Sequence, residues 1–135
     1  GYRMEEHKPN GMILCYPVIT SGKKADLSSI NALLGDMADD EKMLNLVSAE
    51  KQVSSDTPPA FIWHTFTDDD VPVENSLLMA AALKDKEIPF ELHIFPRGPH
   101  GLSIANNITA GGRDNYIIPE CQQWTDMAIR WIENL

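Results

Sequence analysis

The chain has 135 residues, the length of one ordinary domain, and 43% of them are hydrophobic, which fits a folded globular protein. Lysine and arginine together number 11 against 20 aspartate and glutamate residues, giving a net charge of −9. Such an acidic chain lacks the basic surface that is needed to bind nucleic acids or anionic membranes, so neither is predicted as a partner. No apolar run approaches the roughly 20 residues needed to cross a bilayer.

The N-terminal stretch GYRMEEHKPN is polar and contains no apolar segment typical of a signal peptide, so we predict a cytoplasmic protein. It does not begin with methionine, and an upstream part of the protein is therefore expected. Cys15 and Cys121 are too few to indicate a disulfide framework, and both are predicted to be small, buried hydrophobic residues.

Three apolar segments predict β-strands. Residues 12–19 (MILCYPVI) form a nearly continuous apolar run, typical of a strand covered on both faces in a parallel sheet. Residues 60–64 (AFIWH) and 90–95 (FELHIF) are the other two candidates. Three strands are few for such a sheet, so we expect strand 12–19 to lie at an open edge, as in part of a larger domain.

Helices are expected between and after these strands. Residues 21–58 should form an excursion over the sheet, with one helix around residues 39–53; such excursions often act as lids or substrate walls. A second helix should begin near Val73. Its apolar side is marked by Leu77, Leu78, Ala81 and Ala82.

The C-terminal segment 119–135 has the clearest helical periodicity. Pro119 suits its first turn, and an apolar residue recurs every three or four positions thereafter. The predicted buried face comprises Trp124, Met127, Ala128, Trp131, Ile132 and Leu135. The alternation of strands and helices predicts an α/β fold with a mostly parallel, doubly wound sheet.

Polar residues follow the second and third predicted strands. Asp68, Asp69 and Asp70 come shortly after residues 60–64, and His100 follows residues 90–95 within the stretch PRGPHGL. Because the carboxyl ends of parallel strands meet at one edge of the sheet, both loops should face one crevice. A carboxylate that orients a histidine, which in turn deprotonates a hydroxyl, is the acid and base of nucleophilic catalysis.

Simpler interpretations of both features stay open at this point. A run of aspartates before a helix also caps it, and a lone histidine in a Gly/Pro loop is also typical of a solvated turn. The aspartates with His64 or His93 fit neither an EF-hand nor a zinc motif, so no metal is expected. Trp63 is predicted to be a core residue rather than a platform for substrate.

The stretch PPAFIWHTFTDDDVPVENSLLMAAALKDKEIPFELHIFPRGPHGLS resembles the C-terminal part of α/β-hydrolase fold serine esterases, in particular the bacterial acetyl-esterase and acetyl-xylan-esterase-like group. That group's His-x3-Asp-x2-Val-Pro pattern falls on His64, Asp68 and Val71-Pro72. Its Gly-x-His-Gly element falls on Gly98, His100 and Gly101. The resemblance implies that Asp68 is the triad acid and His100 the general base, acting on a small ester, with no cofactor or metal.

The sequence departs from that pattern in one respect, because it contains no Gly-x-Ser-x-Gly elbow for a nucleophile. Ser76 and Ser103 do not lie on a strand-to-helix turn. We therefore predict the C-terminal half of an α/β-hydrolase domain, inactive alone, whose partner is the missing N-terminal half or a second copy. Residues 21–58 should line its acyl or alcohol pocket. A prolyl-oligopeptidase-type peptidase fragment and a non-catalytic truncated module are the alternatives.

Overall fold

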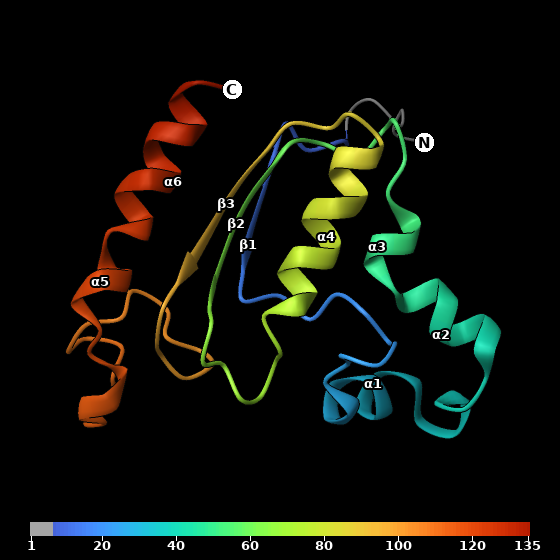
Figure 1. The fold of residues 1–135 in the computed structure, drawn as a ribbon, viewed down its shortest axis with the longest axis horizontal. Coiled ribbons are helices and arrows are strands. Elements are labelled where there is room, and N and C mark those ends of the chain that lie inside the picture. The colour runs from blue at the N-terminus through green and yellow to red at the C-terminus, as the bar shows by residue number, and fades with distance from the viewer. Residues whose placement is uncertain (1–6) are drawn as a thin grey trace.

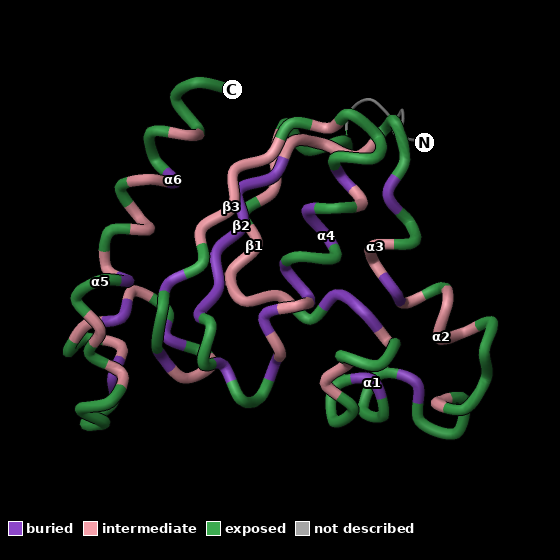
Figure 2. The backbone as a smooth tube through the Cα atoms, viewed as in Figure 1, coloured by how far each residue is buried: buried purple, intermediate pink, exposed green. Residues whose placement is uncertain are grey.

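A parallel sheet of three strands forms the centre of the protein in a computed structural model that describes residues 7–135 (Figure 1). The strands are β1 (Met12–Cys15), β2 (Ala60–Thr65) and β3 (Phe90–Phe95), and they lie in that order. The predicted α/β class and parallel sheet are confirmed, and β1 lies at an edge as expected. β2 is the middle strand, and all six of its residues are buried (Figure 2).

Helices cover both faces of this sheet (Figure 1). One face carries α4 (Glu74–Asp85), and the other carries α5 (Pro119–Gln122) and α6 (Trp124–Glu133). Successive side chains of a strand point to opposite faces, and β2 follows this rule. Phe61 and Trp63 pack in the hydrophobic cluster that includes α6, whereas Ala60 and Ile62 pack in the cluster that includes α4. Trp63 is completely buried, which confirms its prediction as a core residue.

The predicted strand 12–19 is too long, because β1 ends at Cys15. The next residue, Tyr16, has a φ of +40°, a left-handed conformation that a strand cannot contain. Pro17 follows and has no amide hydrogen to donate to a neighbouring strand. The apolar run therefore continues in sequence while the backbone turns away from the sheet.

The segment between β1 and β2 is a series of short helices rather than the single predicted helix over residues 39–53. Ser48 interrupts that helix with an extended ψ of 98°, and its hydroxyl lies 2.7 Å from that of Ser21. α3 packs beside α4, and α1 lies near the carboxyl ends of the strands (Figure 1). The elements are α1 (Leu27–Leu34), the 3₁₀ helix η2 (Gly35–Met37), α2 (Glu41–Val47) and α3 (Ala49–Gln52).

The buried face of α4 differs from the predicted one. Leu77 and Leu78 are 47% and 39% exposed, although the apolar pattern placed them toward the core. The residues that are buried instead are Asn75, Ser76, Met79, Ala80 and Leu83. The pattern was misleading because the side chains of Asn75 and Ser76 are buried to form hydrogen bonds, not to pack apolar surface.

The predicted C-terminal helix 119–135 is divided at Gln123 into α5 and α6. Trp124, Met127, Ala128 and Trp131 contact the sheet-facing cluster as predicted. Ile132 and Leu135 are 51% and 56% exposed, since that cluster ends at Trp131. Among residues 7–135, no helix combines the length and apolar character that a membrane span requires.

Both cysteines are free thiols. Cys121 is completely buried, and this burial raises its pKa to about 11. Cys15 is half-buried, and burial raises its pKa as well. Cys121 is buried as predicted, whereas Cys15 is less buried than expected.

Candidate active site

The carboxyl ends of β2 and β3 start two loops at the same level of the sheet. Thr65, the last residue of β2, is in register with Phe95, the last residue of β3. Phe66 donates its amide to the carbonyl of Phe95 over 2.7 Å, so the two segments stay joined one residue beyond the strands. The acid loop (residues 66–72) and the histidine loop (residues 96–103) therefore begin side by side.

These loops bring Asp68 and His100 into direct contact. Nδ1 of His100 lies 2.8 Å from Oδ2 of Asp68. The Asp68 side chain is 1% exposed and that of His100 is 28% exposed, so the carboxylate is shielded while the ring reaches the surface. Because a carboxylate can only accept, Nδ1 carries a proton and Nε2 of a neutral ring keeps its lone pair. This is how the acid and base of a Ser-His-Asp triad are arranged.

The simpler interpretations of these two residues do not describe the structure. Asp68 does not cap α4, whose N-cap residue is Val73 and has no side-chain cap. Oδ1 of Asp68 instead accepts the amides of Asp70 and Val71, at 3.1 and 2.9 Å, and so closes the acid loop on itself. His100 is not a freely solvated turn residue, because the buried carboxylate binds it.

The environment of Asp68 favours its ionised form. Burial is the largest single influence on its pKa and raises it. Hydrogen bonds from His64, from the Val71 amide and from His100, together with the charge interaction with His100, outweigh burial. The pKa of Asp68 therefore lies below its ordinary value of 3.8, and the group is a carboxylate at neutral pH.

We predict that Asp68 contributes to the acid sensitivity of the fold. A carboxyl group whose folded pKa is depressed stabilises the protein above its unfolded pKa, and this contribution is lost as the pH falls through the lower folded value. The parent should thus lose stability below about pH 3.8 more steeply than Asp68→Asn. Urea unfolding at pH 6 and pH 3 measures this, with the exposed Asp85→Asn as control. Equal acid losses in the parent and Asp68→Asn would contradict it.

A second histidine lies behind Asp68. His64 is on β2 and is completely buried. Its Nε2 lies 3.2 Å from Oδ2 of Asp68 and 2.9 Å from the carbonyl oxygen of Val71. Its Nδ1 lies 2.8 Å from the hydroxyl of Ser76 on α4. From the sequence, His64 is only a possible metal ligand and part of a family pattern, and neither interpretation predicts its contact with the acid.

Gly98 fixes the path of the histidine loop. Its carbonyl accepts the hydroxyl of Thr65 at 2.7 Å, and its amide donates to the hydroxyl of Thr67 at 2.9 Å. Its φ of +143° is one that residues with side chains rarely adopt. A Cβ at this position would lie 2.7 Å from Leu102 and 3.0 Å from Thr65. The loop that carries His100 therefore requires glycine here.

We expect Gly98→Ala to lower the free energy of unfolding by about 2–4 kcal/mol, because backbone strain and overpacking add at this position. Gly111→Ala is a matched control, since Gly111 also has a positive φ (+58°) but no atom within 4 Å of an added Cβ. Strain alone should cost this control about 1 kcal/mol. Urea denaturation measures both, and equal losses would show that the close packing around Gly98 is unimportant.

Tyr16 contacts His100 from the end of β1. The two rings meet edge to face with centroids 4.9 Å apart, and the Tyr16 hydroxyl accepts the amide of Ser103 at 3.1 Å. The side chain thus bridges the ring of His100 and the end of its loop. No sequence pattern indicates this role, because Tyr16 lies inside an apolar run and only its left-handed backbone directs it toward the loop.

Neither candidate serine occupies a nucleophile's position. Ser76 is completely buried, and its hydroxyl is engaged by His64. Ser103 is an exposed residue of the histidine loop with a φ of +53°, and it does not lie at a strand-to-helix turn. Neither serine therefore lies on the strand-to-helix elbow that carries the nucleophile of an α/β-hydrolase.

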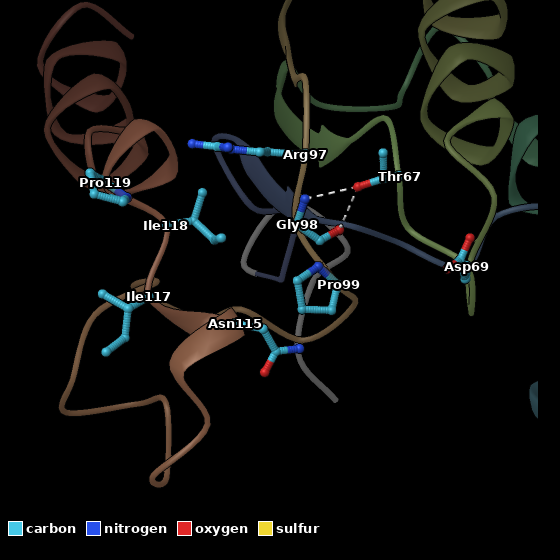
Figure 3. Close-up of a pocket in the computed structure, with 9 residues that line it drawn as sticks. All are labelled: Thr67, Asp69, Arg97, Gly98, Pro99, Asn115, Ile117, Ile118 and Pro119. Carbon is cyan, nitrogen blue, oxygen red and sulfur yellow. Dashed lines mark hydrogen bonds between the residues drawn. The ribbon is translucent and has the colours of Figure 1, made fainter.

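His100 lines a groove of about 520 Å³. Asp26, Ser28 and Ser29 from the start of α1 line the same groove, so part of the segment 21–58 faces His100. A second groove of about 510 Å³ shares Asp69 with the first and is lined by the acid loop, the histidine loop and the segment 115–119 (Figure 3). Within residues 7–135, no group of three or more histidine, cysteine or acidic side chains is arranged so that it could hold a metal ion.

A family model for the prolyl oligopeptidase family matches residues 24–116, which include both the acid loop and the histidine loop. The chain belongs to the prolyl oligopeptidase family. This family member is 53% identical over 100 residues to the endo-1,4-beta-xylanase B of Butyrivibrio fibrisolvens, an alignment that covers 74% of the chain and 16% of that relative.

Solved structures similar to this prolyl oligopeptidase family member include proteins named as ester hydrolases. The acetyl ester-xyloside bifunctional hydrolase of Caldicellulosiruptor lactoaceticus is 44% identical with a TM-score of 0.79, over 93% of this chain and 42% of that one. A carboxylesterase of Lactobacillus plantarum is 32% identical with a TM-score of 0.78, over 93% and 44%. The predicted resemblance to α/β-hydrolase esterases is confirmed. The chain spans less than half the length of these relatives.

Proposed function

We propose that this chain supplies the acid and the base, Asp68 and His100, of a Ser-His-Asp triad in a carboxylic ester hydrolase whose serine lies outside these 135 residues. The observation that carries the proposal is the 2.8 Å contact between Nδ1 of His100 and the buried carboxylate of Asp68. Ester hydrolysis is favoured because two similar solved structures are named as an acetyl ester-xyloside hydrolase and a carboxylesterase.

In this mechanism Nε2 of His100 takes the serine proton as the serine oxygen attacks the carbonyl carbon of the ester. Asp68 stabilises the imidazolium that forms. When the bond to the alcohol breaks, the same proton passes from Nε2 to the leaving alkoxide. A water molecule then attacks the acyl-serine and gives one proton to His100, which passes it to the serine oxygen as the acyl–serine bond breaks. The carboxylic acid and the serine hydroxyl are the products.

The substrate we propose is a small acyl group on a carbohydrate-like alcohol. Two relatives are named for xylan- or xyloside-directed activity. The groove beside His100 carries the polar side chains of Asp26, Ser28 and Ser29, which can form hydrogen bonds with hydroxyl groups. The segment 21–58 would then form one wall of the alcohol or acyl pocket.

Hydrolysis of p-nitrophenyl acetate tests the proposal. The complete protein, encoded by a reading frame extended upstream through a Gly-x-Ser-x-Gly, should hydrolyse the ester, and His100→Ala should abolish this activity. His93→Gln is the control, since His93 pairs with Glu91 on β3 away from the acid loop. The 135-residue chain alone should show little turnover. A robust rate from the chain alone, lost in His100→Ala, would overturn the proposal of an external serine.

Peptide-bond cleavage is the second candidate, because the matching family is named for prolyl oligopeptidase. The same acid and base would serve either reaction. A proline p-nitroanilide peptide distinguishes them: the esterase proposal expects p-nitrophenyl acetate to be hydrolysed far faster than the anilide. The reverse preference would assign a peptidase, and activity on neither substrate would assign a non-catalytic module.

We also propose that the partner of this chain is either the remaining half of its domain or a second copy. In the described part of the chain, β1 pairs with another strand on one side only, and Ile13 on this strand is 40% exposed. An apolar strand with one unpaired edge tends to recruit another chain. Light scattering of the purified chain should therefore detect self-association, and a stable dilute monomer would count against it.

A further inference from the structure

His64 has the surroundings of a functional group although the substrate cannot reach it. Its side chain is 0% exposed on the central strand. Every polar atom of the ring has a partner, and one of those partners is Asp68, which in turn binds His100. The three side chains form one continuous hydrogen-bonded series from the interior to the surface of the protein.

The partners of His64 determine which nitrogen carries the proton. Nε2 faces the carbonyl oxygen of Val71 and the carboxylate of Asp68, and both of these can only accept. Nε2 must therefore be the donor. Nδ1 faces the hydroxyl of Ser76, which can donate or accept, so this contact is satisfied in either protonation state.

The consequence for Asp68 is that four donors hold its two oxygens. Oδ1 accepts the backbone amides of Asp70 and Val71, and Oδ2 accepts Nε2–H of His64 and Nδ1–H of His100. Removal of the His64 ring would free one side of Oδ2 and leave empty space behind the carboxylate. The carboxylate could then tilt into that space and away from His100.

We propose that His64 is a positioning residue of this site: acting through Asp68, it keeps His100 in the tautomer that bears its proton on Nδ1. The catalytic consequence rests on the proposed function, whereas the hydrogen-bond arrangement concerns this chain alone. If His64 only held α4 against the acid loop, its loss would lower stability without changing the tautomer of His100.

Nitrogen NMR of the chain labelled with ¹⁵N only at its four histidines tests the proposal. At about pH 8, where an unperturbed imidazole is neutral, the parent should show His64 protonated at Nε2 and His100 protonated at Nδ1. His64→Gln places an amide nitrogen near the former Nε2 and should retain the His100 signal. His64→Asn reaches only as far as the former Nδ1, so the Nδ1–H signal of His100 should be lost or divided between two tautomers.

His93→Gln is the matched control and should leave the spectrum of His100 unchanged, since His93 has Glu91 as its partner. An unchanged His100 tautomer in folded His64→Asn would overturn the proposal. Should both His64 variants fail to fold by circular dichroism, the parent spectrum decides, because a His64 ring with an unprotonated Nε2 contradicts the proposal by itself.

Kinetics of the complete hydrolase separate this proposal from the proposed function. His64→Asn should lower kcat about 10- to 100-fold with little change in KM. This is the range of loss seen for residues that orient metal-binding histidines. His64→Gln should keep most of the kcat of the parent. Altered tautomers without any ester hydrolysis would retain the positioning role and reject the esterase. Unaltered tautomers and an unaltered kcat in an active esterase would reject the positioning role and retain the proposed function.

Discussion

Substitution of Asp68 by asparagine should lower kcat for p-nitrophenyl acetate by about 10⁴-fold in the complete hydrolase, the loss known for this change in a serine protease triad. Four donors converge on the Asp68 side chain, and an amide can accept at only one of its two terminal atoms. If the amide oxygen keeps the two backbone donors, its NH₂ group faces two ring N–H groups. His100 then adopts the opposite tautomer, and its Nε2 is protonated and cannot act as a base.

The measurement is kcat and KM across pH 5–9 for the parent and the variant. Asp85→Asn is the control for the loss of one negative charge, since Asp85 is an exposed residue near the end of α4. Circular dichroism should show that Asp68→Asn is folded at neutral pH. Activity within about tenfold of the parent would contradict the assignment of Asp68 as the triad acid, since the wrong tautomer costs far more than this.

Asn75→Asp should lower the free energy of unfolding by about 3–5 kcal/mol at neutral pH. The Asn75 side chain is completely buried on α4, and its oxygen accepts the amides of Ile19 and Thr20 at 2.9 and 3.0 Å. Its nitrogen donates to the carbonyl oxygens of Lys24 and Pro72 at 2.8 and 3.0 Å. In a carboxylate the second oxygen would face these two carbonyls, where acceptor opposes acceptor.

The pH dependence of this loss identifies its cause. Burial and facing carbonyls raise the pKa of an introduced carboxyl group, so the penalty should shrink as the pH falls and the group is protonated. Urea unfolding at pH 7 and pH 4.5 measures the change, with Asn107→Asp, on an exposed loop, as control. A loss below about 1 kcal/mol at neutral pH would mean that this amide does not join the residue 19–24 segment to α4.

The fold was predictable where hydrophobic pattern and burial coincide. The apolar run AFIWH and the period of three to four in the C-terminal helix each correspond to buried side chains in the structure. The hydrophobic pattern failed where the buried side chains are polar. Asn75 and Ser76 turn α4 so that Leu77 and Leu78 face outward, and no apolar periodicity records such hydrogen bonds.

The candidate site was predictable to the extent that it depends on loop position. Asp68 and His100 were found because each follows a strand closely and because both match a family pattern. His64 and Tyr16 were not assigned to the site, since each lies in a run that looks like ordinary strand core. Their contacts depend on a ring direction and on a left-handed backbone, neither of which one sequence specifies.

β2 and β3 end at the same level of the sheet, so the number of residues after this level sets the position of each loop side chain. From the aligned pair Thr65 and Phe95, the chain advances three residues to Asp68 and five to His100. These counts, rather than the identity of the intervening residues alone, set the 2.8 Å distance between the two side chains. Insertions at the opposite ends of these strands should therefore be tolerated. An insertion between Thr65 and Asp68, or between Phe95 and His100, would separate the acid from the base.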